Sequence, residues 1–238
     1  MTTTTTTDTG VRDLYYPTFS VRDVDRALRF YGALFGWTEK GERFRAGDTS
    51  HADLATAVPF GIHDRGEPGT TELTFAADDL DDALAAVVDA GGSYELDESG
   101  EHAVCLDDQG VRFGLMKTTH RPVSPIGRIP FDTVGYVTID VPDGARGRRF
   151  YAAVLGWQYE GGLANPGFTT VPMGLAEGAT EPGHTIFVKV ADAAATAERV
   201  RALGGTAGTL DESPSGITVA CTDDQGTRFA LWQPAPGY

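Results

Sequence analysis

The chain has few cysteines, a deficit of positive charge and no long hydrophobic run. Of its 238 residues only two are cysteines, so it is not a small fold held together by disulfides. Its 19 lysines and arginines are outnumbered by 34 aspartates and glutamates, and the formal net charge is -15. That charge repels phosphate backbones and anionic lipid surfaces. We therefore expect neither nucleic acid nor a membrane as a partner.

Targeting signals are also missing. No stretch approaches the roughly 18 apolar residues of a membrane span, and the start, MTTTTTTDTG, lacks the basic and apolar regions of a secretory signal. We expect a cytoplasmic protein with a disordered polar tail at residues 1–11. Cytosolic thiols stay reduced, so Cys105 and Cys221 are predicted to be free and buried rather than paired.

What the sequence does contain is an internal repeat, whose second copy begins about 120 residues after the first. Residues 18–37 match residues 138–157 and share the pairs Phe-Tyr and Gly-Trp. The segment DDQGVRFGL, which begins at Asp107, matches DDQGTRFAL, which begins at Asp223, and VPFGI matches VPMGL. We predict two domains, 12–117 and 131–238, which a proline-containing linker at 118–130 joins.

Inside each repeat the hydrophobic period switches between about 2 and about 3.6, as expected where a strand leads into a helix. Alternation around Phe19 predicts a strand, and Asp23 then stands where a helix N-cap belongs, with Gly36 at the helix end. The same pattern recurs with Asp79 as the cap, and again in the second repeat with Asp192 as the cap. Turn signals after each helix predict short antiparallel strands.

A strand, a helix and about three strands, twice per repeat, resemble the vicinal oxygen chelate superfamily of glyoxalase, bleomycin-resistance and extradiol dioxygenase domains. The motifs V-x-D, F-Y-x-x-x-x-G-W and D-D-Q-G-x-R-F-x-L carry the resemblance, which covers nearly all of the chain outside the tail and linker. Among these proteins, the chain resembles in particular the two-domain glyoxalase-like proteins of actinobacteria. The resemblance implies an α+β fold with tandem glyoxalase-like domains, each of two βαβββ units whose curved mixed sheets form a cup. We call these cup 1 and cup 2.

The superfamily usually holds a divalent metal in each cup with side chains from the first, fifth and eighth strands. The resemblance places these positions at Tyr16, Glu72 and Gly114 in the first repeat, and at Tyr136, Thr185 and Ala230 in the second. Only Glu72 is an ordinary ligand, whereas a catalytic metal needs about three protein donors. No histidine lies in a close metal-binding spacing with another histidine or a cysteine. We expect no metal and no other cofactor.

Strand alternation, phased by the resemblance, predicts which side chains face the cups. The set for cup 1 is Tyr16, Thr18, Ser20, Glu72, Thr74, Arg112 and Met116. The set for cup 2 is Tyr136, Thr138, Asp140, Thr185, Phe187, Lys189, Arg228 and Trp232. His184, beside the fifth-strand position, is a further binding candidate or else a strand residue bonded to backbone. A competing interpretation fills the cups with structural ion pairs, Arg112 with Glu72 and Arg228 with Asp140.

Three functions remain open. Rings, hydroxyls and arginines suit an aromatic or polyketide-like metabolite, bound without metal for resistance or for specialised-metabolite and antibiotic biosynthesis. The alternative is a metal-free isomerase, cyclase, lyase or hydroxylase, in which Tyr16 or Tyr136 acts as acid, Arg112 or Arg228 steadies an oxyanion and Glu72 is the base. A divalent-metal glyoxalase or dioxygenase ranks below both. The chain is expected to be a monomer or homodimer, and the unequal fifth strands favour one functional cup.

Overall fold

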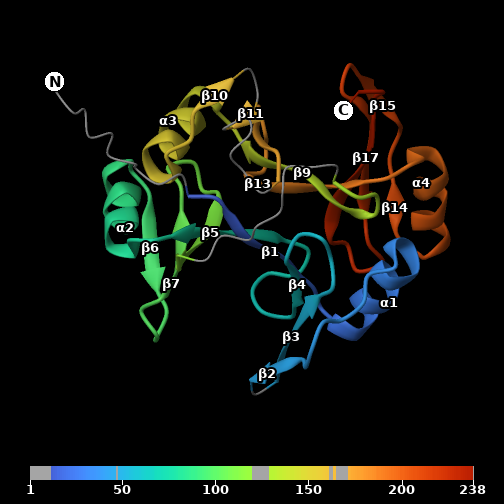
Figure 1. Ribbon diagram of the computed structural model, residues 1–238, viewed down its shortest axis with the longest axis horizontal. Coiled ribbons are helices and arrows are strands. Elements are labelled where there is room, and N and C mark those ends of the chain that lie inside the picture. The colour runs from blue at the N-terminus through green and yellow to red at the C-terminus, as the bar shows by residue number, and fades with distance from the viewer. Residues whose placement is uncertain (1–11, 47, 120–128, 161–162, 165–170, 238) are drawn as a thin grey trace, which may run out of the picture.

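A computed structural model describes residues 12–46, 48–119, 129–160, 163–164 and 171–237, and shows two curved sheets with four helices (Figure 1). The expected tail at 1–11 and most of the linker at 118–130 lie outside the described residues. In the described part, no helix is long and apolar enough to cross a membrane.

The first repeat forms an eight-stranded mixed sheet, ordered β2-β3-β4-β1-β5-β8-β7-β6. Its strands are β1 (Leu14–Ser20), β2 (Phe44–Ala46), β3 (Thr49–Leu54), β4 (Phe60–His63), β5 (Thr71–Ala77), β6 (Ser93–Leu96), β7 (His102–Leu106) and β8 (Arg112–Lys117). Its helices are α1 (Val24–Phe35) and α2 (Leu80–Asp89). The two βαβββ units meet where β1 pairs antiparallel with β5. This is the predicted α+β design.

The second repeat builds the same sheet, ordered β10-β11-β12-β9-β13-β17-β16-β14, with β15 paired to β16. Its strands are β9 (Thr133–Val141), β10 (Tyr159–Glu160), β11 (Leu163–Ala164), β12 (Met173–Glu177), β13 (Gly183–Lys189), β14 (Thr206–Ala207), β15 (Asp211–Ser213), β16 (Gly216–Thr222) and β17 (Arg228–Pro234). Its helices are α3 (Gly144–Leu155) and α4 (Ala193–Ala202). Each sheet therefore consists of the strands of one repeat.

The helix boundaries follow from local chemistry. Each N-cap is an aspartate in an extended conformation, and its carboxylate accepts hydrogen bonds from the first-turn amides that the helix leaves without partners. The helix α1 ends at Gly36, whose φ of 73° is in the left-handed region that glycine adopts without a steric penalty. The predicted caps Asp23, Asp79 and Asp192 are all confirmed.

The core is buried between the sheets and their helices. Full burial is found at the strand positions that alternate with the cup 1 residues, such as Phe19, Leu73 and Phe113. Cys105 and Cys221 are both free and buried, as the sequence predicts.

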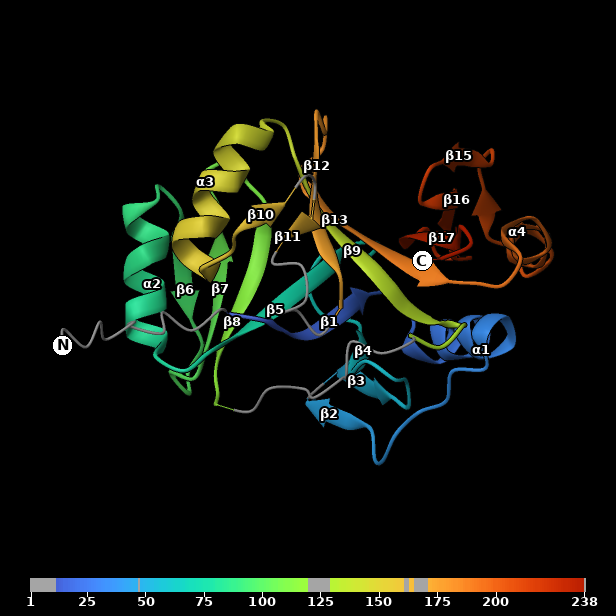
Figure 2. The ribbon, with the colours of Figure 1, turned by 45° about the horizontal axis from the view of Figure 1, so that its top comes forward.

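The helices pack across the repeats, which the sequence does not predict. The helix α1 lies beside α4, and α2 lies beside α3 (Figures 1 and 2). Phe30 and Tyr31 of α1 make edge contacts with Phe229 of β17, and Phe113 of β8 contacts Tyr151 of α3 in the same way. The two repeats thus share one apolar core.

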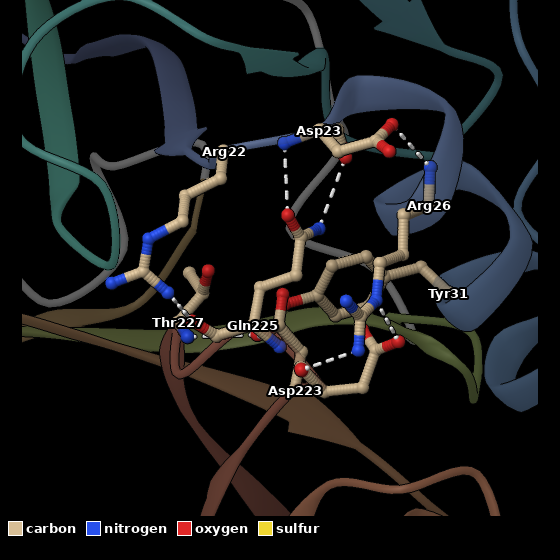
Figure 3. A network of polar contacts seen from close by, with 8 residues as sticks. Arg22, Asp23, Arg26, Tyr31, Asp223, Gln225 and Thr227 are labelled. Carbon is tan, nitrogen blue, oxygen red and sulfur yellow. Dashed lines mark hydrogen bonds and ion pairs between the residues drawn. The ribbon is translucent and has the colours of Figure 1, made fainter.

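The repeated D-D-Q-G motif fastens this arrangement (Figure 3). The side-chain amide of Gln225 accepts a hydrogen bond from the Asp23 amide at 2.8 Å and donates to the Asp23 carbonyl at 3.0 Å. The guanidinium of Arg26 pairs with Asp224 at 2.5 Å, and the buried Tyr31 hydroxyl donates to Asp223 at 3.2 Å. The turn of the second repeat is therefore bound to the first helix of the first repeat.

The same contacts occur in the opposite direction. Gln109 bonds both backbone groups of Asp143, at 2.7 and 3.1 Å, and Arg146 pairs with Asp108 at 3.0 Å. The Tyr151 hydroxyl donates to Asp107 at 3.1 Å. We call the two sets of contacts the interlocks. Their near twofold symmetry explains why both copies keep D-D-Q-G and Phe-Tyr: these residues join the repeats.

Candidate functional site

A cavity of about 980 Å³ lies over the concave face of the first sheet. All seven side chains predicted for cup 1 line it: Tyr16, Thr18, Ser20, Glu72, Thr74, Arg112 and Met116. They come together because β1, β5 and β8 are neighbours in the sheet, and because residues two apart on a strand share a face. Whether these residues act on a ligand remains a prediction.

The second repeat contributes one wall of the same cavity. Of the residues predicted from that repeat, the wall includes Asp140, His184, Thr185 and Arg228, but not Tyr136, Thr138, Phe187, Lys189 and Trp232. The five side chains outside the wall contact other residues of the second repeat. The ring of Tyr136 lies 5.6 Å from that of Phe187, and the Trp232 indole donates to the Ser215 carbonyl at 3.1 Å. The cavity therefore lies mainly in cup 1.

Of the two predicted ion pairs, the Arg112–Glu72 pair is present, and the prediction of an Arg228–Asp140 pair is wrong. Arg112 Nε lies 3.0 Å from Glu72 Oε2, as expected. Arg228 pairs instead with Glu181 at 2.6 Å, and both of these side chains are exposed.

Asp140 has different partners. The β9–β13 register places Thr185 opposite Thr138, and both lie on the same face of the sheet as Asp140. Both threonine hydroxyls donate to its carboxylate at 2.6 Å. The carboxylate is therefore satisfied without Arg228.

Tyr16 belongs to a tight polar cluster. Its hydroxyl donates to the Asp53 carboxylate and lies 3.0 Å from His51 Nε2. Burial, followed by the hydrogen bond to Asp53, raises the pKa of Tyr16 far above its ordinary value. Gly61 makes room for the ring, since a Cβ at that position would lie 2.4 Å from the Tyr16 hydroxyl oxygen. Burial also raises the pKa of Tyr136.

The cavity wall also includes three histidines that the sequence analysis did not assign to it, namely His51, His63 and His102. His51 and His63 are directly paired residues of β3 and β4, and their rings stack with centroids 5.9 Å apart. The alternation of polar His51 with apolar neighbours is a signal that it faces away from the core. The register that brings it beside His63 depends on strand pairing, which has no local signature.

His184 fits both interpretations in part. Its Nδ1 bonds the Thr71 carbonyl at 3.1 Å, where β13 meets β5, so the backbone does satisfy one ring nitrogen. Its Nε2 is buried without a hydrogen-bond partner in the described part of the protein. Burial lowers the pKa of His184.

The positions that would hold the superfamily metal do not offer its donor set. Glu72 is engaged by Arg112, and the Tyr16 hydroxyl is engaged by Asp53. At Gly114 even a Cβ would lie 2.6 Å from Thr74 Oγ1 and 3.0 Å from His102 Nε2. Among the described residues, no three His, Cys, Asp or Glu side chains are grouped to hold an ion.

Comparison with known proteins agrees with this architecture. A protein of Mycobacterium bovis named "Putative glyoxylase CFP32" is 27% identical over 90% of this chain and 92% of its own length. A crystal structure of catechol 2,3-dioxygenase matches with a TM-score of 0.58 at 16% identity, covering 96% of this chain and 90% of that one. The Mn(II)-bound glyoxalase of Novosphingobium aromaticivorans matches with a TM-score of 0.61 at 14% identity, covering 93% and 81%.

The pattern of the family described as "Glyoxalase-like domain" matches residues 17–116 and again residues 136–232. These two ranges hold most of both sheets and all four helices. The chain belongs to the glyoxalase-like domain family and carries that domain twice.

Proposed function

We propose that the chain is a metal-independent binding protein that holds a small, oxygenated aromatic or polyketide-like metabolite in cup 1. The observation that carries this proposal is the cavity of about 980 Å³, which is large enough for a ligand of several fused rings. Its wall combines ring faces, such as Tyr16 and His63, with hydroxyls and arginine donors. Rings stack on rings, and hydroxyls and guanidinium groups bond ligand oxygens.

The state of Tyr16 supports binding over acid catalysis. A general acid works best when its pKa lies near the operating pH, whereas the pKa of Tyr16 is raised far above its ordinary value. Its proton is also committed to Asp53. The metal-free enzyme thus requires Tyr16 to give up a proton that its surroundings retain.

The metal-free enzyme nevertheless has a direct test in a tyrosine variant. If the protein converts a compound that it binds, Tyr16→Phe and Tyr136→Phe should abolish turnover while preserving binding. Unchanged rates in both variants would remove the tyrosines from the chemistry.

The proposal is tested by mass spectrometry of compounds that co-purify with the protein and by fluorescence titration with 2-naphthol, a neutral hydroxylated aromatic probe. We expect a bound aromatic compound, recovered unchanged, and saturable 2-naphthol binding that the co-purified compound displaces. Conversion of the compound would contradict a purely binding role. Near-stoichiometric divalent metal in protein purified without chelator would contradict metal independence, which matters because the mycobacterial relative is named for glyoxylase chemistry.

A further inference from the structure

One end of cup 1 has hydrogen-bond donors without acceptors. This end, which we call the β3–β4 end, consists of His51, Asp53, His63 and Arg65. Three of these residues line the cavity, and Asp53 bonds Tyr16, which also lines it. The hydrogen-bond geometry assigns each proton at this end to an atom.

His63 presents a free N–H. The Arg65 backbone amide lies 3.2 Å from His63 Nδ1, and because an amide nitrogen only donates, Nδ1 must be the acceptor and Nε2 must carry the proton. Burial, followed by the nearby charge of Arg65, lowers the pKa of His63 to about 4, so the ring is neutral at pH 7. In the described part of the chain, Nε2–H has no hydrogen-bond acceptor.

His51, by contrast, is fully engaged. Arg65 Nη2 lies 3.4 Å from His51 Nδ1, and because a guanidinium only donates, the His51 proton is on Nε2. That nitrogen lies 3.0 Å from the Tyr16 hydroxyl oxygen and 3.2 Å from Asp53 Oδ1. His51, Tyr16 and Asp53 therefore satisfy one another and leave no donor for a ligand.

Arg65 brings to the cavity wall a positive charge that no carboxylate of the described residues pairs with. Its backbone is fixed on both sides, because its amide bonds His63 and its carbonyl accepts from the Ser20 hydroxyl. The other two arginines of the cavity wall, Arg112 and Arg228, are each paired with a glutamate. Arg65 forms no ion pair with any carboxylate that the structure describes, including that of Glu67 two residues further on.

We propose that His63 Nε2–H and the Arg65 guanidinium bind a carboxylate of the ligand in cup 1, so that the ligand class is an aromatic carboxylic acid. This proposal rests on the proposed binding function. It specifies which chemical group of the ligand bonds the β3–β4 end. A carboxylate has two oxygens that accept hydrogen bonds, and a hydrogen bond that involves charge is about twice as strong as a neutral one.

The test compares two probes that differ only in the carboxylate, 2-naphthol and 3-hydroxy-2-naphthoate, by ligand fluorescence. In Arg65→Met we expect affinity for the naphthoate to fall about tenfold or more and affinity for naphthol to stay within about twofold. His63→Leu should act in the same direction. Arg45→Met is the control, because it removes the same charge from an exposed side chain that does not line this cavity.

The outcomes separate the two proposals. If the wild-type protein binds naphthol and naphthoate equally, and Arg65→Met leaves their ratio unchanged, the carboxylate assignment is overturned while binding in cup 1 stands. If the wild-type protein binds neither probe and carries no co-purifying aromatic compound, both proposals fall. An equal loss in Arg45→Met would show a general charge effect and would also overturn the assignment.

Discussion

The interlocks between the repeats can be tested by removing a single oxygen atom. Tyr31 is fully buried, and its hydroxyl donates at 3.2 Å to the carboxylate of Asp223, which is 2% exposed. The change Tyr31→Phe keeps the ring contacts and leaves one carboxylate oxygen without its donor. A hydrogen bond to a charged group contributes about 1.5–3 kcal/mol to the free energy of unfolding, and we expect a loss of that size.

The twofold symmetry of the interlocks supplies a second, matched perturbation. Tyr151→Phe removes the equivalent bond to Asp107, at 3.1 Å, and should cost a similar amount. The two sites share no partner, so the double variant should lose the sum, about 3–6 kcal/mol, which is a large part of the stability of an ordinary domain.

The assay is urea unfolding followed by tryptophan fluorescence, with Tyr94→Phe as the control because that ring is exposed on β6. The control should change the free energy of unfolding by less than about 0.5 kcal/mol. Losses of that small size in Tyr31→Phe and Tyr151→Phe would refute the view that these tyrosines hold the repeats together.

Two further predictions concern cup 1. The folded-state pKa of His63 is lowered to about 4, so between about pH 6.5 and pH 4 the unfolded chain binds a proton that the folded chain does not, and this part of the stability falls as the pH falls. Urea midpoints at pH 7 and pH 5 should therefore differ less in His63→Gln than in the wild type, and an equal difference would contradict the burial of a neutral ring. Gly61→Ala places a Cβ where the Tyr16 hydroxyl lies and should cost about 1–3 kcal/mol, whereas Gly183→Ala, with open space around its Cβ, should be nearly neutral in the same unfolding assay. Equal costs in the two variants would show that Tyr16 is not held as described.

Much of this fold is encoded locally and could be predicted. The change of hydrophobic period and the capping aspartates fix the strands and helices, as Asp23 and Gly36 illustrate. Strand alternation groups the residues that share a face, and the family resemblance indicates which face forms the cup. Every residue predicted in this way for cup 1 lines the cavity.

Contacts between distant segments could not be predicted, because no local pattern encodes them. Gln225 reads as part of a turn, and only the packed structure shows that its amide bonds Asp23. The stacking of His51 on His63 depends on the β3–β4 register, and the partner of Arg228 depends on where Glu181 lies at the rim. Predictions from one strand at a time therefore identified the face of the cup but not its full set of side chains.

The central claim is that two copies of one domain provide a single ligand site, in cup 1. Isothermal titration with 3-hydroxy-2-naphthoate measures the number of sites per chain. We predict one site per chain. Thr74→Phe should abolish it, because the variant places in cup 1 a ring like that of Phe187 in cup 2, and Phe187→Leu should retain it. Urea midpoints establish that both variants are folded. Two sites per chain, or binding that survives Thr74→Phe and is lost in Phe187→Leu, would contradict the account.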